Sequence, residues 1–282
     1  MNQPAFVTRF APSPTGALHR GHAFSALTAF EAARAVGGRF ILRIEDIDFT
    51  RCPPEFEASI FDDLAWLEIE WEPPVLRQSE HIADYLAALE SLRADGLVYR
   101  CFKTRREILD DIGRAPHGPG EGYRGTPLPA DEEAERLVRG EPYAWRLALD
   151  VAMDRVGALA FTEEGQGPGG EHGVVAVDPR EAGDVVLARK DVGVAYHLAV
   201  VVDDARQGIT HVIRGHDLFE ATHVQRLLQE LLGYRQPVYR HHRLLVGADG
   251  KRLAKRDRAQ TLAEIRASGM SPAALRAELG FA

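Results

Sequence analysis

The sequence predicts an α/β protein made of a Rossmann-like core, an inserted α+β module and a short helical tail. Residues 6–44 carry the pattern of a strand, a turn, a helix and a second strand, which is typical of a parallel nucleotide-binding sheet. The chain has 282 residues, which is long for one domain and short for three, and 45% of them are hydrophobic. These values favour a single core with an insertion.

We expect four segments in chain order. They are the first half of the core, the inserted module, the second half of the core, and a basic loop with a helical tail, over residues 1–100, 101–190, 191–240 and 241–282. The module is predicted because Gly and Pro gather at 113–129 and Gly again at 163–173. Between these stretches, alternating patterns predict short strands at 143–149 and 156–161.

The opening unit is the most clearly patterned part of the chain. Residues 6–10 form a predicted strand, which the following Pro, Ser, Thr and Gly residues cannot continue. Apolar residues then recur at helical spacing, at Phe24, Leu27 and Phe30. Gly37 and Gly38 end this helix, and residues 39–44 form a second strand, which we expect to lie parallel to the first.

Further elements follow in a regular order. Helices are predicted after Pro53 and Ser79, and a strand over 97–101. The core resumes with a nearly continuous apolar run at 195–204, which predicts a strand buried on both faces. The remaining predicted elements are a strand, a longer helix and a last short helix, at 210–215, 217–232 and from Ser271.

Two segments predict a nucleotide site. His19 and His22 lie near the start of the first helix, where unpaired N–H groups and the helix dipole favour an anion, and their spacing puts both imidazoles on one face. Histidines at helix starts also commonly cap or pack, so the pair alone leaves this open. Basic residues over 251–256 follow the turn signal Asp249-Gly250 and would supply the cations of such a site.

Charged residues at predicted strand ends suggest an amino acid site. Arg9 and Arg214 each fall near the end of a strand, and two guanidiniums at one sheet edge form a fork matched to a carboxylate. Glu45 follows the second strand and could bind an ammonium. Together they describe an acidic amino acid, although each could instead be an ordinary solvated charge. Tyr196 is either a core residue or a further contact.

Charge and cysteine content exclude several classes of protein. The net charge is −8, from 34 Lys and Arg against 42 Asp and Glu, which argues against a chain that coats nucleic acid non-specifically. Residues 235–258 nevertheless hold eight Lys or Arg against two Asp, which is either an RNA-facing patch or a solvated face. Two cysteines, no leader pattern and no long apolar span indicate a cytoplasmic protein without a membrane segment.

Taken together, these segments resemble the class I glutamyl-tRNA synthetases. The resemblance spans nearly the whole chain in the right order, through the stretches 9–22, 43–46, 196–204, 212–215 and 251–256. Residues 19–22 stand at the family's HIGH signature and 252–256 at its KMSKS loop, with Arg252 in place of the first Lys and Ala254 in place of Ser.

The resemblance implies a full set of site residues. Catalysis would fall to His19, His22 and Lys255. The residues implied for glutamate are Arg9, Ala11, Ser13, Glu45, Tyr196 and Arg214. Those implied for ATP are His19, Gly21, His22, Arg252, Leu253 and Lys255, with Mg²⁺ accompanying the nucleotide and no dedicated protein cage.

The position at which the sequence ends indicates which branch of the family it resembles. Full-length members continue in an anticodon-binding domain, whereas this sequence stops just after the KMSKS-like loop. It therefore resembles the truncated glutamyl-queuosine branch, which activates glutamate without tRNA and places it on queuosine at the wobble position of tRNA(Asp). The implied partner is the tRNA(Asp) anticodon stem-loop, and we expect a monomer.

Three alternatives remain at this point. A truncated glutamyl-tRNA synthetase would charge the tRNA 3′ end. A small nucleotidylyltransferase also uses a His-x-Gly-His sequence, but the set of Arg9, Glu45 and Arg214 argues against it. A paralogue that only binds RNA would not need both histidines and Lys255.

The resemblance also bears on zinc. The branch often has a Cys-x-Cys pair followed by Tyr-x-x-x-Cys. Here Cys101 and Tyr123 are present, but Lys103 and Pro127 occupy the other two positions. A structural zinc ion needs four good ligands, so we expect none.

Overall fold

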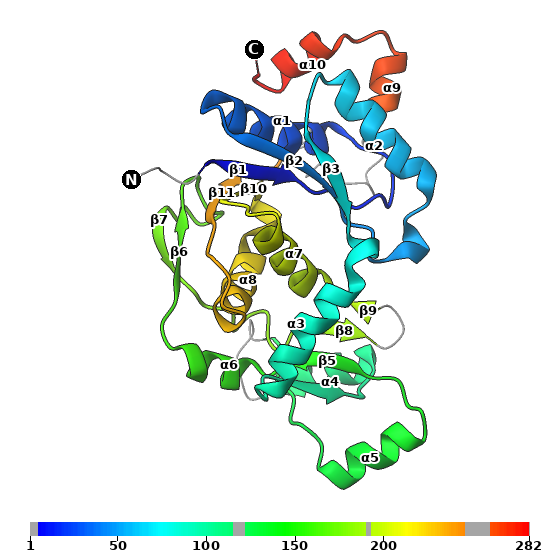
Figure 1. The fold of residues 1–282 in the computed structure, drawn as a ribbon, viewed down its shortest axis with the longest axis vertical. Coiled ribbons are helices and arrows are strands. Elements are labelled where there is room, and N and C mark those ends of the chain that lie inside the picture. The colour runs from blue at the N-terminus through cyan, green and yellow to red at the C-terminus, as the bar shows by residue number, and fades with distance from the viewer. Residues whose placement is uncertain (1–4, 115–121, 190–192, 246–259, 282) are drawn as a thin grey trace.

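The computed structural model describes residues 5–114, 122–189, 193–245 and 260–281 (Figure 1). The first three strands form a parallel sheet in the order β1-β2-β3, with bounds Val7–Phe10, Arg39–Ile44 and Glu72–Arg77. The predicted parallel pairing of the first two is confirmed, because Val7 lies opposite Arg39 and Phe10 opposite Leu42. The helix α1 (Arg20–Ala35) joins these two strands and packs on both.

A second set of strands extends this parallel arrangement. β10 (His211–Gly215), β11 (Val238–His242) and β6 (Ala160–Glu163) are parallel neighbours, and β7 (Gly173–Ala176) pairs antiparallel with β6. The Thr210 N–H donates to the Val7 carbonyl at 2.9 Å, which sets β10 beside β1. The carboxyl ends of β1, β2, β10 and β11 therefore share one edge, where α/β proteins bind their ligands.

The third sheet is antiparallel and lies toward the end of the molecule opposite to the C-terminal helices (Figure 1). Its order is β4-β5-β8-β9, with bounds Val98–Cys101, Ala144–Leu147, Val186–Arg189 and Gly193–Val194. The helices of this region are α4 (Arg105–Arg114), α5 (Ala130–Val138) and α6 (Leu149–Val156). Since β6 and β7 join the core sheet instead, the stretch 101–190 contributes to two sheets; its limits as an inserted module stay a prediction.

The predicted strand at 195–204 is wrong, because this segment is the helix α7 (Tyr196–Arg206). Its residues from Leu198 to Asp204 are all buried, since α3, α8 and β8 pack around it. A helix buried all round shows the same unbroken apolar run as a central strand, so periodicity cannot separate the two. The predicted strand over 143–149 is shorter than expected, since β5 ends at Leu147 and α6 begins at Leu149. The strand predicted over 156–161 starts later, at Ala160, because α6 continues to Val156.

The other helices match their predicted places. They are α2, α3, α8 and α10, with bounds Pro54–Trp66, Ile82–Ala94, Phe219–Leu231 and Pro272–Glu278. A further short helix, α9 (Leu262–Ala267), precedes α10, and its position was not predicted. Short 3₁₀ turns occur at Phe49–Arg51, Gln78–His81 and His216–Leu218. None of the helices in the described ranges is long and apolar enough to cross a bilayer.

Candidate active site

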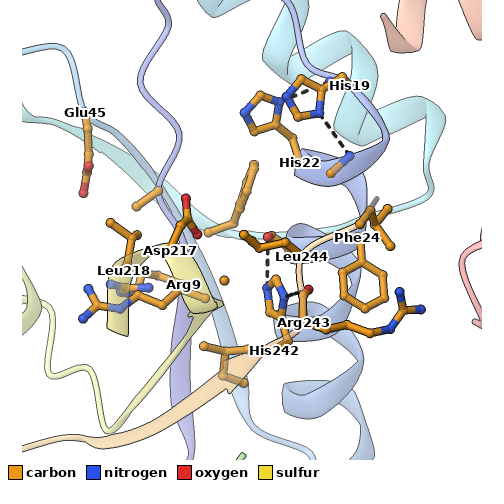
Figure 2. Close-up of a pocket in the computed structure, with 18 of the residues that line it drawn as sticks. Arg9, His19, His22, Phe24, Glu45, Asp217, Leu218, His242, Arg243 and Leu244 are labelled. Carbon is orange, nitrogen blue, oxygen red and sulfur yellow. Dashed lines mark hydrogen bonds between the residues drawn. The ribbon is translucent and has the colours of Figure 1, made fainter. Parts of the chain in front are cut away.

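A cavity of about 420 Å³ opens at the shared carboxyl edge of the strands. Figure 2 shows residues that reach it from α1, β1 and the segment that follows β11. Eight of the predicted site residues line it: Arg9, Ala11, His19, Gly21, His22, Glu45, Tyr196 and Arg214. The structure thus gathers residues that are up to 205 positions apart in the chain, by the difference 214 − 9.

The other predicted residues fall elsewhere. Ser13 lines an adjoining cavity of about 250 Å³, which shares Glu45 and Tyr196 with the first. The Ser13 hydroxyl donates to the Glu45 carbonyl oxygen at 2.6 Å, so Ser13 holds the backbone of a site residue. Arg252, Leu253 and Lys255 lie outside the described residues.

His19 and His22 both cap the helix and face the cavity. The His19 Nδ1 accepts from the Gly21 N–H at 3.1 Å, and the His22 Nδ1 accepts from the His19 N–H at 3.2 Å. Their rings stack with centroids 3.8 Å apart. Because each Nδ1 acts as an acceptor, the proton of each neutral ring sits on Nε2. The two possibilities raised by the sequence are therefore compatible, since capping uses the Nδ1 atom of each ring while both rings line the cavity.

The position of Gly21, between the two histidines, has no room for a side chain beside the His19 ring. A Cβ atom at this position would stand 3.0 Å from the His19 Cε1 and 3.1 Å from its Nδ1. Contacts this short would push the His19 ring away from the helix start. The glycine thus permits the His19 ring to fold over the first turn, and with it the stacked arrangement.

The segment 246–259, which carries Lys255, is flanked by residues of this site. Leu245, just before it, lines the cavity. After it, Thr261 forms a β-bridge with His19, and the Leu262 N–H donates to the Leu18 carbonyl at 2.9 Å. Thr261 also caps α9 by accepting from the Glu264 N–H. The residue before the predicted KMSKS-like loop therefore lines the cavity, and the residues after it contact the start of the HIGH-like segment.

Arg9 is anchored by a buried ion pair that the sequence analysis did not foresee. Its Nε and Nη2 donate to Asp204 of α7 at 3.0 and 3.3 Å, and Arg43 donates to the same carboxylate at 2.7 Å. Burial alone would raise the pKa of Asp204, but Arg9 and Arg43 together hold it below its usual value. Asp204 therefore stays ionised and fixes Arg9 in place, with one terminal nitrogen left to face a ligand.

Glu45 is a buried carboxylate that also belongs to this cluster. Its Oε1 accepts from the Arg43 Nη2 at 3.1 Å. Burial raises its pKa, although Arg43 and Arg9 oppose the shift. Since desolvation disfavours the ionised form, a ligand ammonium beside Glu45 would stabilise the charge. This is the arrangement expected for an amino group.

Arg214 differs from Arg9 in having only neutral partners. Its three nitrogens donate to the His241 Nε2 at 3.2 Å, the Gln225 Oε1 at 2.8 Å and the Thr222 Oγ1 at 2.7 Å. The side chain is 5% exposed. Within the described ranges no carboxylate lies at ion-pair distance from it. One N–H remains on each terminal nitrogen, which is the number that a carboxylate accepts in a bidentate pair.

Several cavity residues were missed by the sequence analysis. The helix α1 contributes Phe24 and Ser25 to the cavity wall. The turn after β10 contributes Asp217, and the end of β11 adds His242 and Arg243 (Figure 2). His242 donates from Nδ1 to the Arg243 carbonyl at 2.9 Å, so its Nε2 accepts from the Ser25 hydroxyl at 3.0 Å. Because β11 itself was not predicted, nothing marked these residues as strand-end groups.

The residues considered for zinc are arranged without a metal-binding cluster. The Cys101 Sγ lies 4.0 Å from the Tyr123 hydroxyl, and Lys103 instead pairs with Asp111 at 2.6 Å. Among the residues that the structure describes, no group of three or more His, Cys, Asp or Glu could hold a metal ion.

Comparisons with known proteins agree with this geometry. Residues 5–281 match the model of the catalytic domain of class I tRNA synthetases for E and Q, that is, glutamate and glutamine. A protein named glutamyl-Q tRNA(Asp) synthetase from Rhodobacter capsulatus is 50% identical over 98% of this chain and 100% of its own length. Glutamate–tRNA ligase 2 from a Methylobacterium species is 42% identical over 95% of this chain, which spans 58% of that protein.

Comparison with solved structures also finds glutamate–tRNA synthetases. The glutamate–tRNA synthetase of Elizabethkingia anophelis superposes with a TM-score of 0.74 and 30% identity over 90% of this chain. This chain spans about half of that one, at 53%. The cavity formed by His19, His22 and the strand-end arginines therefore lies in a fold shared with amino acid-activating enzymes, and the chain belongs to the catalytic-domain family of the class I glutamyl- and glutaminyl-tRNA synthetases.

Proposed function

We propose that this protein activates glutamate with ATP and transfers it to queuosine at the wobble position of tRNA(Asp). The observation that carries the amino acid assignment is Arg214, a buried cation at the cavity with neutral partners on all three nitrogens. Such a group favours an anionic ligand. The acceptor assignment is supported by relatives named glutamyl-Q tRNA(Asp) synthetase, one of which this chain spans completely.

The binding roles follow from the charges around the cavity. Arg214, with the remaining nitrogen of Arg9, would take the side-chain carboxylate of glutamate, and Glu45 would take its ammonium. Tyr196 at the first turn of α7 and Ala11 after β1 would close the pocket around the aliphatic part. Ser13 would act on the ligand through the backbone of Glu45.

The reaction would be an in-line displacement at the α-phosphorus of ATP. An oxygen of the glutamate α-carboxylate forms a bond to this phosphorus, the bond to the β-phosphate oxygen breaks, and pyrophosphate leaves. The Nε2 donors of His19 and His22, with Gly21 permitting their approach, would meet the phosphate oxygens whose charge grows. One such donor is typically worth about 10²–10³ in rate. Lys255, with Arg252 and Leu253 of the same loop, would complete this contact.

Further partners follow from the same proposal. Mg²⁺ would arrive with the ATP phosphates, since it binds mainly through phosphates and water, and we assign it no protein ligand. The acceptor would be the anticodon stem-loop of tRNA(Asp), and the protein would act as a monomer in the cytoplasm. Its phosphates would meet basic residues of the segment 235–258.

Glutamate-dependent ATP–pyrophosphate exchange without tRNA tests the activation step. We expect labelled pyrophosphate to appear in ATP when glutamate is added and no RNA is present, because all proposed contacts with glutamate and ATP come from the protein. A ribonuclease-treated sample is the matched control. Exchange that requires added tRNA would contradict the proposal and favour a truncated glutamyl-tRNA synthetase.

A further inference from the structure

A buried acid and imidazole lie directly behind Arg214 and have no part in the proposed chemistry. His241 of β11 donates to the Glu163 Oε2 of β6 through Nδ1, at 2.5 Å, and the side chains of both residues are fully buried. The other ring nitrogen of His241, Nε2, lies 3.2 Å from the Arg214 Nε and also 3.2 Å from the Thr222 hydroxyl, which can donate to it as well. A carboxylate, an imidazole and a guanidinium thus form one hydrogen-bonded chain that ends at the cavity.

The chemistry of the chain fixes the proton on His241. The Arg214 Nε can only donate, so Nε2 must carry the lone pair, and the ring proton must sit on Nδ1, toward Glu163. Burial lowers the pKa of His241, with Arg214 adding to this effect and Glu163 opposing it, so the ring stays neutral. Burial would raise the pKa of Glu163, but hydrogen bonds from His241 hold it below its usual value, so the carboxylate stays ionised.

Glu163 is placed to hold that tautomer. Its Oε1 accepts from the backbone N–H groups of His241 and Gly165, each at 2.8 Å, which leaves Oε2 for the imidazole. Gly165 cannot carry a side chain, because a Cβ atom would stand 2.3 Å from the His241 carbonyl oxygen. The backbone N–H groups of His241 and Gly165 therefore fix the orientation of the Glu163 carboxylate.

We infer that Glu163 and His241 are positioning residues that hold Arg214 ready for the carboxylate of the amino acid substrate. The inference rests on the proposed function, since it assigns Arg214 to that carboxylate. Without the lone pair on Nε2, the Arg214 Nε would lose a buried acceptor, and its guanidinium would turn away from the geometry that leaves two N–H groups for the ligand.

The variant Glu163→Gln tests the tautomer directly. Its amide oxygen would take the two backbone donors, so its NH₂ would face Nδ1, and the His241 proton would move to Nε2, against Arg214. We expect the KM for glutamate to rise about tenfold or more, while the KM for ATP stays within about twofold. Glu164→Gln is the matched control, because Glu164 is the next residue and its carboxylate pairs with the partly exposed Arg240, at 2.9 Å, away from His241 and Arg214.

Two further readouts separate positioning from a general loss of structure. Nitrogen-15 spectra of the histidine rings are expected to show His241 protonated on Nδ1 in the wild type and on Nε2 in Glu163→Gln, with His241→Gln identifying the signal. His241→Gln keeps an oxygen near the Nε2 position and is expected to retain more glutamate affinity than His241→Leu. An unchanged KM for glutamate in Glu163→Gln, or equal KM values for the two His241 variants, would overturn the inference. If the wild type itself shows no exchange with glutamate, the proposed function fails, while the ring spectra still report on the hydrogen-bonded chain.

Discussion

Glutamine is expected to be activated about 10⁴-fold less efficiently than glutamate, measured as kcat/KM in ATP–pyrophosphate exchange. The family model covers enzymes for both amino acids, so the choice between them has to come from the site. An amide in place of the side-chain carboxylate would bring an NH₂ group against the guanidinium of Arg214. It would also leave that buried cation without a counter-charge, which is costly in a partly desolvated pocket.

The comparison needs one matched variant. Arg214→Gln replaces the cation with a group that can both donate and accept, so the preference for glutamate over glutamine should fall steeply in that variant. Equal exchange rates with glutamate and glutamine in the wild type would contradict the assignment of Arg9 and Arg214 to the substrate carboxylate.

Replacement of Lys255 by alanine is expected to slow glutamyl-adenylate formation by about 10²-fold or more, with little change in glutamate affinity. The ammonium would act on phosphate oxygens whose negative charge grows only in the transition state, so its loss should appear in kcat. Single-turnover adenylate formation measures this rate, and titration with glutamate measures affinity.

Lys103→Ala is the control for Lys255→Ala, because Lys103 pairs with Asp111 in the α4 region, outside the cavity. It is expected to leave both quantities unchanged. A Lys255→Ala protein with normal turnover and weakened glutamate binding would remove Lys255 from the proposed role.

The opening unit of the fold could be predicted because its signals are local. The β1-α1-β2 unit is marked by turn residues after the first strand, by the helical spacing of apolar residues, and by the glycines that end the helix. The structure confirms the predicted parallel pairing of the two strands. The helix α7 could not be predicted in the same way, since its apolar run reflects burial by other elements, among them α8 and α3, the second of which is distant in sequence. Local patterns thus failed where long-range packing set the environment.

In the candidate site, too, the residues close in sequence could be predicted together, and the contacts between distant segments could not. His19, His22 and Gly21 lie within one turn, and the sequence predicted their shared position. The partners of the arginines come from other elements: Asp204 from α7, and Thr222 and Gln225 from α8. All three are buried polar residues, and their role becomes clear only in the structure, where Arg9 and Arg214 lie beside them.

The most direct test of the central claim is to locate the glutamate that this protein attaches to tRNA. Queuosine-containing tRNA(Asp) would be incubated with the protein, ATP and labelled glutamate, and the product digested with nuclease to find the labelled nucleotide. We predict label on the wobble queuosine, and equal labelling of an isolated queuosine-containing anticodon stem-loop. Label confined to the 3′-terminal adenosine would contradict the account and identify an enzyme that charges the tRNA 3′ end.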